Sequence, residues 1–202
     1  MLRKSLTISL ISLTLLLSAC GNDDAGKDAG KPTASASPTQ TAPDAGSKFA
    51  ITSNAAGLVQ LGMSLDDVLA ALPDATTKTE QGGDGIEWTN IELKGKAVMS
   101  VLLNEDHTVS LIRVFSPQFT TEQGVTVGEN LQSAADKLGG LNEIQSTEIE
   151  SREFATFKNA SPSMEFQVIG KDGSAGVYNN NETTTAVASP SATIHSIWIM
   201  ED

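Results

Sequence analysis

The sequence is poor in the residues on which most catalytic and cross-linked sites depend. Its 202 residues include one cysteine, Cys20, and two histidines, and aromatic residues make up 4% of the chain. One cysteine cannot form a disulfide within the chain, so a folded domain must be stable through its apolar core alone. The G-x-S-x-G, H-E-x-x-H and phosphate-loop motifs are also missing, which argues against the enzyme classes that use them.

Positive charge is scarce as well. The chain has 13 Lys and Arg against 25 Asp and Glu, a formal net charge of −12, and residues 49–202 alone carry −13. Binding of nucleic acid depends on Lys and Arg that neutralise phosphates, so nucleic acid is not expected as a partner. Direct adhesion to anionic lipid headgroups is disfavoured for the same reason. The simplest interpretation of the acidic surface is solubility.

No apolar stretch is long enough to be expected to span a bilayer. The mainly apolar residues 6–17 follow Arg3 and Lys4 and precede Leu17-Ser18-Ala19-Cys20. A membrane-spanning helix needs about 20 residues, and this stretch is shorter. A charged start, a short apolar centre and small residues before a cleavage point are typical of an export signal. We therefore predict a signal peptide at residues 1–19.

The last residues of the predicted signal peptide also indicate lipid attachment. Leu17-Ser18-Ala19-Cys20, followed by Gly21, resembles the lipobox of bacterial lipoproteins. The resemblance implies cleavage before Cys20, diacylglycerol on its thiol, frequent acylation of the new amine, and a lipid anchor to the membrane. Two or three acyl chains hold a protein stably, whereas one holds it only reversibly. The alternative is an ordinary secretory signal that happens to end in cysteine.

Lipoprotein sorting rules suggest a destination. Gly21, rather than Asp, follows Cys20, which by resemblance implies the outer membrane with the domain facing the periplasm, or the cell membrane in a Gram-positive source. Residues 20–48 contain no aromatic or branched aliphatic residue and are rich in small and polar ones. Such a composition predicts a disordered tether, with a plain spacer favoured over a binding epitope. Residues 49–202 are long enough for one domain.

That domain matches itself at a constant offset of 66 residues. Residues 59–72 and 125–138 align in their apolar, glycine and helix-cap positions. Residues 58–61 and 125–127 are short runs expected to be strands that end at Gly62 and Gly128, and Ser64 and Asn130 occupy helix N-cap positions. Each predicted helix has apolar residues at helical spacing: Leu65, Val68, Leu69 and Leu72 in one, and Leu131, Ala134, Ala135 and Leu138 in the other. Pro73 and Gly139-Gly140 end these helices.

Three strands are predicted after each helix. They are residues 86–93, 96–103 and 109–115 in the first copy, and 152–157, 164–169 and 193–200 in the second. The turn pairs Lys94-Gly95 and Glu105-Asp106 separate the first set, and residues 170–190 form an expected long exposed loop. The fold class is therefore α+β, with two strand-helix-antiparallel-meander repeats (about 55–117 and 122–202) and helices on one face of the sheet. Both one sheet and two sheets are compatible with the pattern.

The same residues resemble a known family. Residues 57–65, the strands around 99–115, Gly124 to Gly128 and residues 194–199 together resemble the sigma-E-regulated outer-membrane lipoproteins, a domain family of unknown function. Some members carry a cysteine pair after the second helix, which this chain lacks, so no disulfide-dependent property is implied. The repeat is also similar to that of secreted β-lactamase inhibitor proteins and small outer-membrane assembly lipoproteins. Fold analogy of this kind favours binding modules without establishing function.

Few residues are candidates for a site. His107 lies in a predicted turn, and His195 lies in the last strand, on the same face as Ile197 and Ile199 if the strand is regular; neither is expected to be catalytic. Residues 81–85 precede a strand rather than a helix and so do not suit phosphate, and the oxygen-rich residues 172–173 and 179–182 do not match the calcium-loop spacing. We expect no catalytic residue, metal or cofactor.

Trp88 and Trp198, the largest apolar side chains, are expected in the core, although an exposed ring would mark a possible interface. The chain is thus expected to be a non-catalytic binding or envelope stress and maintenance module. Its expected partners are the membrane, through Cys20, and an envelope protein or glycan. The alternative is a proteinaceous inhibitor of a periplasmic or secreted hydrolase, because an acidic surface would attract cationic enzymes.

Overall fold

The computed structural model describes residues 47–83, 85–148 and 151–201. All of them belong to one compact unit of the chain. The predicted signal peptide (1–19), Cys20 and all of the predicted tether except Ser47 and Lys48 lie outside the described residues, as does Asp84 of the glycine-rich segment.

The described part is mostly β, with two short helices, α1 (Leu65–Ala71) and α2 (Leu131–Lys137). Short strands open the chain and flank the helices: β1 (Ala50–Thr52), β2 (Ala55–Ala56), β3 (Val59–Gln60) and β8 (Thr120–Thr121). Four longer strands follow α1: β4 (Ala75–Gln81), β5 (Glu87–Leu93), β6 (Lys96–Leu103) and β7 (Val109–Val114). The strands after α2 are β9 (Leu141–Ser146), β10 (Glu153–Phe157), β11 (Met164–Ile169), β12 (Thr184–Thr185) and β13 (Thr193–Met200).

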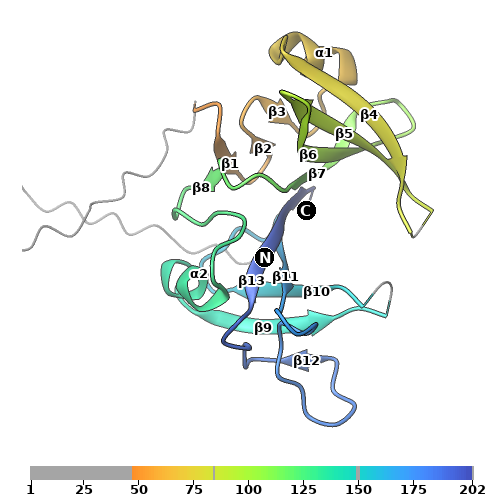
Figure 1. Cartoon of the computed structure of the whole chain (residues 1–202). Helices are drawn as coiled ribbons and strands as arrows, with labels where there is room; N and C mark the ends of the chain where they lie inside the picture. The colour runs from red at the N-terminus through yellow and green to blue at the C-terminus, as the bar shows by residue number, and fades with distance from the viewer. Residues whose placement is uncertain (1–46, 84, 149–150, 202) are drawn as a thin grey trace, which may run out of the picture. The chain divides into compact units, whose positions relative to one another are not determined.

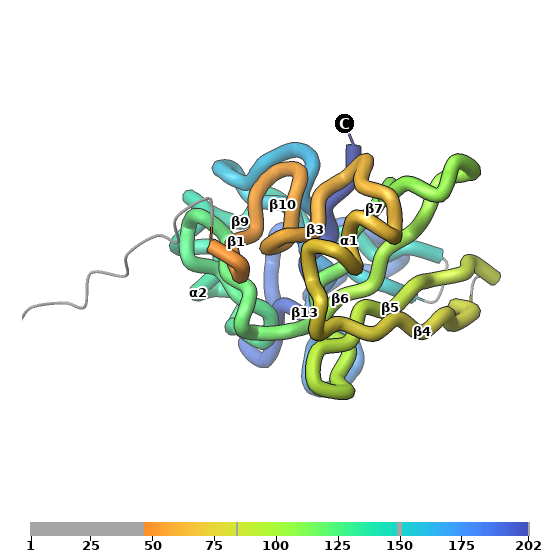
Figure 2. Tube along the Cα trace, turned by 90° about the horizontal axis from the view of Figure 1, so that it is seen from above, coloured from red at the N-terminus to blue at the C-terminus, as the bar shows by residue number. Residues whose placement is uncertain are grey.

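The strands form one large sheet and one small one. The large sheet has nine antiparallel strands in the order β12-β9-β10-β11-β13-β7-β6-β5-β4, and the small sheet has the order β3-β2-β1-β8. Strands of the first repeat (yellow to green in Figures 1 and 2) therefore form one half of the large sheet, and those of the second (cyan to blue) form the other. The α+β class and the repeat are confirmed, and the two repeats share a single sheet.

The two halves meet at the antiparallel pair of β7 and β13. Their register places Leu111 opposite Met200 and Val114 opposite Ile197, and the centre of the pair joins Arg113 to Trp198. Each half contains a four-stranded meander that ends at this pair, β4 to β7 in the first repeat and β9, β10, β11 and β13 in the second, where β12 adds an outer strand beside β9. The sheet thus has an approximate two-fold axis through Arg113 and Trp198. The 66-residue repeat implied such a symmetry but did not show where the axis lies.

Equivalent turns connect each helix start to the last strand of its own repeat. Gly62 N–H donates to Val109 O and Gly128 N–H donates to Ile194 O, both at 2.8 Å. The glycines have φ values of +81° and +86°, which other residues rarely adopt. The predicted caps follow at once: Ser64 Oγ accepts from Asp67 N–H, and Asn130 Oδ1 accepts from Gln132 N–H. These glycines and caps therefore tie each helix to the centre of the sheet.

Regular alternation predicted that His195 shares a face with Ile197 and Ile199, and this prediction is wrong. Ile194 and Ser196 pair with Val168 and Gln167, so His195 is the extra residue of a β-bulge and is exposed. A bulge shifts the alternation of side chains by one residue, which the sequence pattern did not reveal. Ser110 is the corresponding extra residue in β7, so the irregularity repeats in both halves.

Besides the short strands β1, β2, β8 and β12, two longer strands were not predicted from the sequence. β4 and β9 each follow a helix directly and lie toward the outer edges of the sheet. Their residues are mostly exposed and polar, so neither strand has the alternating apolar pattern on which the prediction depended. Conversely, residues 125–127 are not a strand; only a single bridge joins Thr126 to Thr120. Of the two short runs expected to be strands, residues 58–61 contain β3 and residues 125–127 form no strand.

The apolar core lies between one face of the large sheet and the helices and small sheet. Its fully buried members include Val68 of α1 and Leu131 of α2, together with Ile112 and Ile197 from the central strands. In α2 all four predicted apolar positions are buried, whereas in α1 only Val68 is. α1 is therefore packed less completely than α2.

A buried carboxylate organises the long loop between β11 and β13. Glu153 of β10 is 6% exposed and accepts hydrogen bonds from Ala175 N–H (2.5 Å), Gly176 N–H (2.9 Å), Ser174 Oγ (2.8 Å) and Tyr178 Oη (2.7 Å). Burial by itself would raise the pKa of this carboxyl, but the four hydrogen bonds outweigh burial and hold the pKa below its ordinary value. The loop was predicted to be exposed, but these hydrogen bonds fix its base and bury part of it.

Replacing Glu153 by glutamine is expected to destabilise the domain by about 2–3 kcal/mol near neutral pH, because charge-assisted hydrogen bonds are lost. The folded pKa is lower than the unfolded one, so this contribution is complete above the ordinary pKa of 4.5 and disappears as pH falls through the lowered value. Urea unfolding of wild type and Glu153→Gln should therefore differ most near neutral pH and converge in acid.

Glu165→Gln is the matched control. Glu165 is partly buried in β11, and burial raises its pKa. Its charge therefore opposes folding at neutral pH, and its removal should leave stability unchanged or increased. Equal destabilisation by both substitutions would contradict the anchoring role of Glu153.

Candidate functional site

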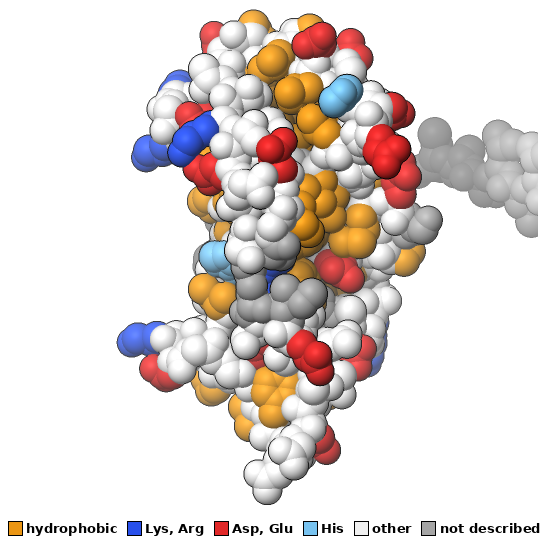
Figure 3. All heavy atoms as spheres, turned by 90° about the vertical axis from the view of Figure 1, so that its right-hand side faces the viewer, with side chains coloured by type: hydrophobic (Ala, Val, Ile, Leu, Met, Phe, Trp, Pro, Cys, Tyr) orange, Lys and Arg blue, Asp and Glu red, His pale blue; other side chains and the backbone are white. Residues whose placement is uncertain are grey.

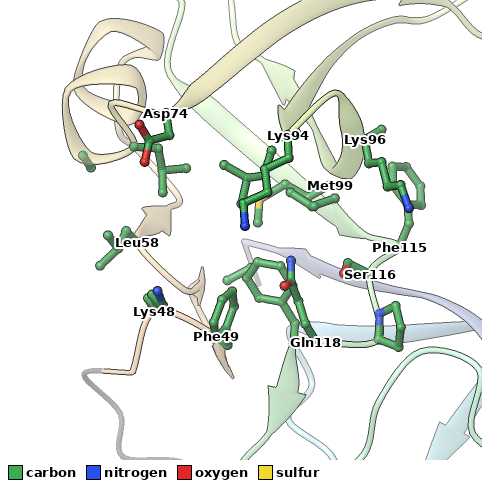
Figure 4. Close-up of a pocket in the computed structure, with 18 of the residues that line it drawn as sticks. Lys48, Phe49, Leu58, Asp74, Lys94, Lys96, Met99, Phe115, Ser116 and Gln118 are labelled. Atoms are coloured by element: carbon green, nitrogen blue, oxygen red, sulfur yellow. The ribbon is translucent and has the colours of Figure 1, made fainter.

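A cavity among the described residues lies between the small sheet, the end of α1 and the turn that joins β5 to β6. Its volume is about 730 Å³, within the range of about 300–1,000 Å³ typical of small-molecule sites. Four segments that are distant in sequence line it: residues 48–58, 71–74, 93–99 and 115–119. Figure 4 shows these segments surrounding a common space.

The lining is largely apolar. Its larger apolar side chains come from all four segments: Phe49, Leu58, Leu72, Leu93, Val98, Met99, Phe115 and Phe119. Phe119 and Met99 are almost fully buried at the back, whereas Leu58 is 41% exposed. Phe49 and Phe119 pack edge to face with ring centroids 5.5 Å apart. The cavity thus has a rigid aromatic wall and one exposed apolar side chain.

Most of the charged groups that border this lining are positive. Lys48, Lys94 and Lys96 line the cavity with a single acid, Asp74. The described residues contain nine Lys and Arg against 18 Asp and Glu, so the local balance is the reverse of that in the rest of the domain. The ion pairs found among described residues join Lys78 to Glu80 and Lys137 to Glu129, and none involves these three lysines.

The lysines differ in where their ammonium groups point. Figure 4 shows Lys94 reaching from the β5–β6 turn across the cavity toward Gln118, with Lys48 beside Phe49 and Leu58. Lys96 instead lies beside Phe115, and Asp74 lies near the end of α1. Lys48 Nζ is also 5.1 Å from the centroid of the Phe49 ring. Lys94, Lys48 and Gln118 are therefore the polar groups best placed to meet a ligand.

The second repeat closes the corresponding space. Leu93 and Phe157 occupy equivalent positions, because each pairs with the first residue of the strand that follows its helix, Ala75 and Leu141. In the second repeat Lys158 N–H donates to Gly140 O at 3.1 Å and Asn159 N–H donates to Leu138 O at 2.9 Å. No equivalent backbone bond joins residues 94–95 to residues 72–74 in the described first repeat. The cavity is therefore a feature of one repeat and not of the fold.

The sequence after each helix explains the difference. Gly139 has φ +78°, and a Cβ there would lie 2.3 Å from Asn159 Nδ2, so only glycine allows this close approach. The equivalent position in the first repeat is Pro73, followed by Asp74 instead of Gly140. Neither residue offers the same backbone freedom or closeness. The difference between Pro73-Asp74 and Gly139-Gly140, together with three lysines nearby, was the sequence signal that could have located the site. The sequence-based prediction did not use this signal.

Trp88 and Trp198 lie on the opposite face of the large sheet. They are 4% and 7% exposed and are not part of the hydrophobic core cluster. Their rings are 5.6 Å apart, and the Phe154 ring lies 5.2 Å from Trp198. The Arg113 guanidinium stacks at 4.3 Å from Trp88 and 5.4 Å from Trp198. We call these four residues the aromatic face.

The aromatic face supports the sheet rather than offering an exposed ring. Trp198 Nε1 donates to Ser196 Oγ at 2.7 Å, whereas Trp88 Nε1 has no hydrogen-bond partner among the described residues. Figure 3 shows hydrophobic side chains in a strip with acidic groups along its border on the side of the molecule that it presents. An interface role for Trp88 or Trp198 stays a prediction, and the exposed ring that would mark one is found at neither position.

The other predicted candidates are not brought together. His107 is exposed in the β6–β7 turn with φ +63°. Partial burial, and then the charge of Arg113, lower the pKa of His195. Within residues 47–83, 85–148 and 151–201, no cluster of three or more His, Cys, Asp or Glu could hold a metal ion. In the same ranges, no helix has the length and apolar character needed to cross a membrane.

Comparisons with known proteins give a fold and no family. No protein-family model matches the chain, and no curated protein matches it. Its structure is similar to the crystal structure of the uncharacterized protein yfeY from Escherichia coli, with a TM-score of 0.52 and 14% sequence identity. The alignment covers 77% of this chain and 100% of that chain. At this identity the similarity establishes the shared fold alone.

Proposed function

We propose that this chain is a lipid-anchored lipoprotein of the bacterial envelope whose domain binds a ligand without transforming it. The cavity beside α1 is the observation that carries the proposal. It has the volume and apolar lining of a binding site, and its ionisable groups are three lysines and one aspartate. No histidine lies in it, and the two described histidines belong to other parts of the fold.

The anchor and setting depend on the sequence. The lipobox-like Leu17-Ser18-Ala19-Cys20 and the tether predicted at residues 20–48 support a domain held near a membrane. Gly21 supports the outer membrane and the periplasm, by resemblance to sorting rules. The resemblance to sigma-E-regulated lipoproteins supports a part in envelope stress or maintenance, with an envelope protein or glycan as a possible further partner.

Binding in the cavity can be tested with N-phenyl-1-naphthylamine, a neutral apolar dye whose fluorescence increases in a dry site. The full chain with Cys20→Ser is suitable, because it retains every described residue and lacks acyl chains that would compete. The dye is expected to bind saturably, since the lining removes it from water. Ala97→Trp in this background should abolish binding, because Ala97 is exposed and lines the cavity.

Ala70→Trp is the control for that substitution. Ala70 is also exposed, lies in α1 and does not line the cavity. It should leave dye binding unchanged, and both variants should unfold at the same urea concentration as their parent. Dye binding that survives Ala97→Trp would place the dye elsewhere and contradict the assignment of the cavity.

The anchor has its own test. Cys20→Ser removes the thiol that would carry the lipid, so the protein should leave the membrane fraction, while the wild type stays with it. The described domain begins at residue 47, so its unfolding free energy should not change. Membrane association that persists in the variant, with no loss of export, would overturn lipid anchoring at Cys20.

A second candidate function is inhibition of a periplasmic or secreted hydrolase. It is supported by the acidic excess outside the cavity, where all but one of the 18 described carboxylates lie. Such a surface would attract cationic enzymes such as lysozymes, and the attraction would weaken with salt. Inhibition of at least one enzyme in a hydrolase panel, reduced at high ionic strength, is the expected result; unchanged activity across the panel with excess full chain would eliminate this function.

A further inference from the structure

We infer that the ligand of the cavity is a single-chain amphiphile with an anionic headgroup, a carboxylate or a phosphate. The acyl chain lies against the apolar lining, and the headgroup meets Lys94 and Lys48. This inference rests on the proposed function, because it takes the cavity to be the binding site.

The lining favours one flexible apolar chain. The apolar residues come from four segments and enclose a continuous space of about 730 Å³. Its back is formed by nearly inaccessible side chains, Met99 and Phe119, at 1% and 2% exposure. Among the residues that line the cavity, only Ser116 and Gln118 offer hydrogen-bonding side chains besides the four charged residues. An extended polar ligand such as an oligosaccharide would leave most of its hydroxyl groups without partners there.

The charges favour an anion over a cation or a neutral headgroup. One third of the described Lys and Arg line this cavity, although the domain as a whole is acidic. Lys94 Nζ points across the cavity toward the Gln118 amide, and Lys48 stands beside Phe49. No ion pair among the described residues neutralises either ammonium group. A carboxylate or phosphate at this point would gain charge-assisted hydrogen bonds from Lys94 and a further donor from Gln118.

The backbone of Lys94 adds an independent observation. Its φ is +54°, in the left-handed region that lysine rarely adopts and that asparagine and glycine favour. A turn of this kind is commonly built from Asn-Gly, yet this chain has Lys94-Gly95. The equivalent residue of the closed repeat, Lys158, does not have a positive φ. The open repeat thus holds a lysine in a strained turn at the position where its ammonium group reaches the cavity.

The position of the cavity along the chain agrees with a ligand from a membrane. Lys48 and Phe49 line it, and the tether predicted from the sequence ends at residue 48. A flexible coil of that length has an end-to-end distance of about 30 Å. A domain on such a tether stays close enough to the bilayer to receive a single-chain lipid that leaves it.

The test measures displacement of N-phenyl-1-naphthylamine from the full chain with Cys20→Ser by four dodecyl compounds below their micelle concentrations. They are dodecanoate, dodecyl phosphate, dodecyl maltoside and dodecyltrimethylammonium, which share a tail and differ in headgroup. At least one anionic compound is expected to displace the dye at about 10-fold lower concentration than the maltoside, and the ammonium compound is expected to be weakest. Preference for the carboxylate or for the phosphate identifies the headgroup.

Lys94→Asn is the decisive variant. Asparagine tolerates the positive φ, so the turn should be at least as stable, while the ammonium group is lost. The advantage of anionic over neutral compounds should fall about 5- to 10-fold, with affinity for the neutral compound unchanged. Lys158→Asn removes the same charge from the equivalent turn of the closed repeat and should leave all four affinities unchanged.

The outcomes separate this inference from the proposed function. If the dye does not bind at all, the cavity is not a binding site and both fail. If the dye binds but the four compounds displace it equally, the proposed function stands and the anionic headgroup is overturned. An equal effect of Lys94→Asn and Lys158→Asn would also overturn it, because net charge and not the cavity would then set the preference.

Discussion

The pairing of β7 with β13 is the interaction on which the rest of the structure depends. It joins two four-stranded meanders, which together with β12 beside β9 form the nine-stranded sheet, and it places the approximate two-fold axis at Arg113 and Trp198. The helix starts are tied to the same strands, since Gly62 bonds to Val109 and Gly128 to Ile194. A sheet half with its edge unpaired would expose a row of backbone donors and acceptors. Neither repeat is therefore a complete unit without the other.

Much of this could be predicted from the sequence because the repeat carries local signals that tertiary contacts do not override. The caps at Ser64 and Asn130 and the turn at Lys94-Gly95 depend on single residues with specific backbone preferences. β4 and β9, which lie toward the outer edges of the sheet, could not be recognised, because their mostly exposed and polar residues lack the apolar alternation. The bulge at His195 is defined by hydrogen-bond register with β11, a nonlocal property that no local pattern encodes.

The candidate site was less predictable than the fold for a physical reason. A cavity arises where side-chain packing is incomplete, and no periodic pattern of apolar residues in the sequence marks such a place. In this protein the cavity can be recognised only by comparing one repeat with the other. Gly139-Gly140 lets the β10–β11 turn form backbone hydrogen bonds with the end of α2, whereas Pro73-Asp74 does not allow the same contact in the first repeat. Leu72, at the end of α1, lines this cavity and is only partly buried, whereas its equivalent Leu138 is buried. The second repeat thus serves as an internal comparison for the packing of the first.

The residues on the two-fold axis also determine which strand each half can accept. Arg113 and Trp198 are equivalent positions that face each other, and the guanidinium lies 5.4 Å from the indole ring. If the first half paired with a copy of itself in this register, two arginines would be opposite each other, and like charges across a strand pair repel. The axis therefore favours cross-pairing over self-pairing. The difference between Arg113 and Trp198 at this symmetric position therefore disfavours association of the first half of one molecule with the first half of another.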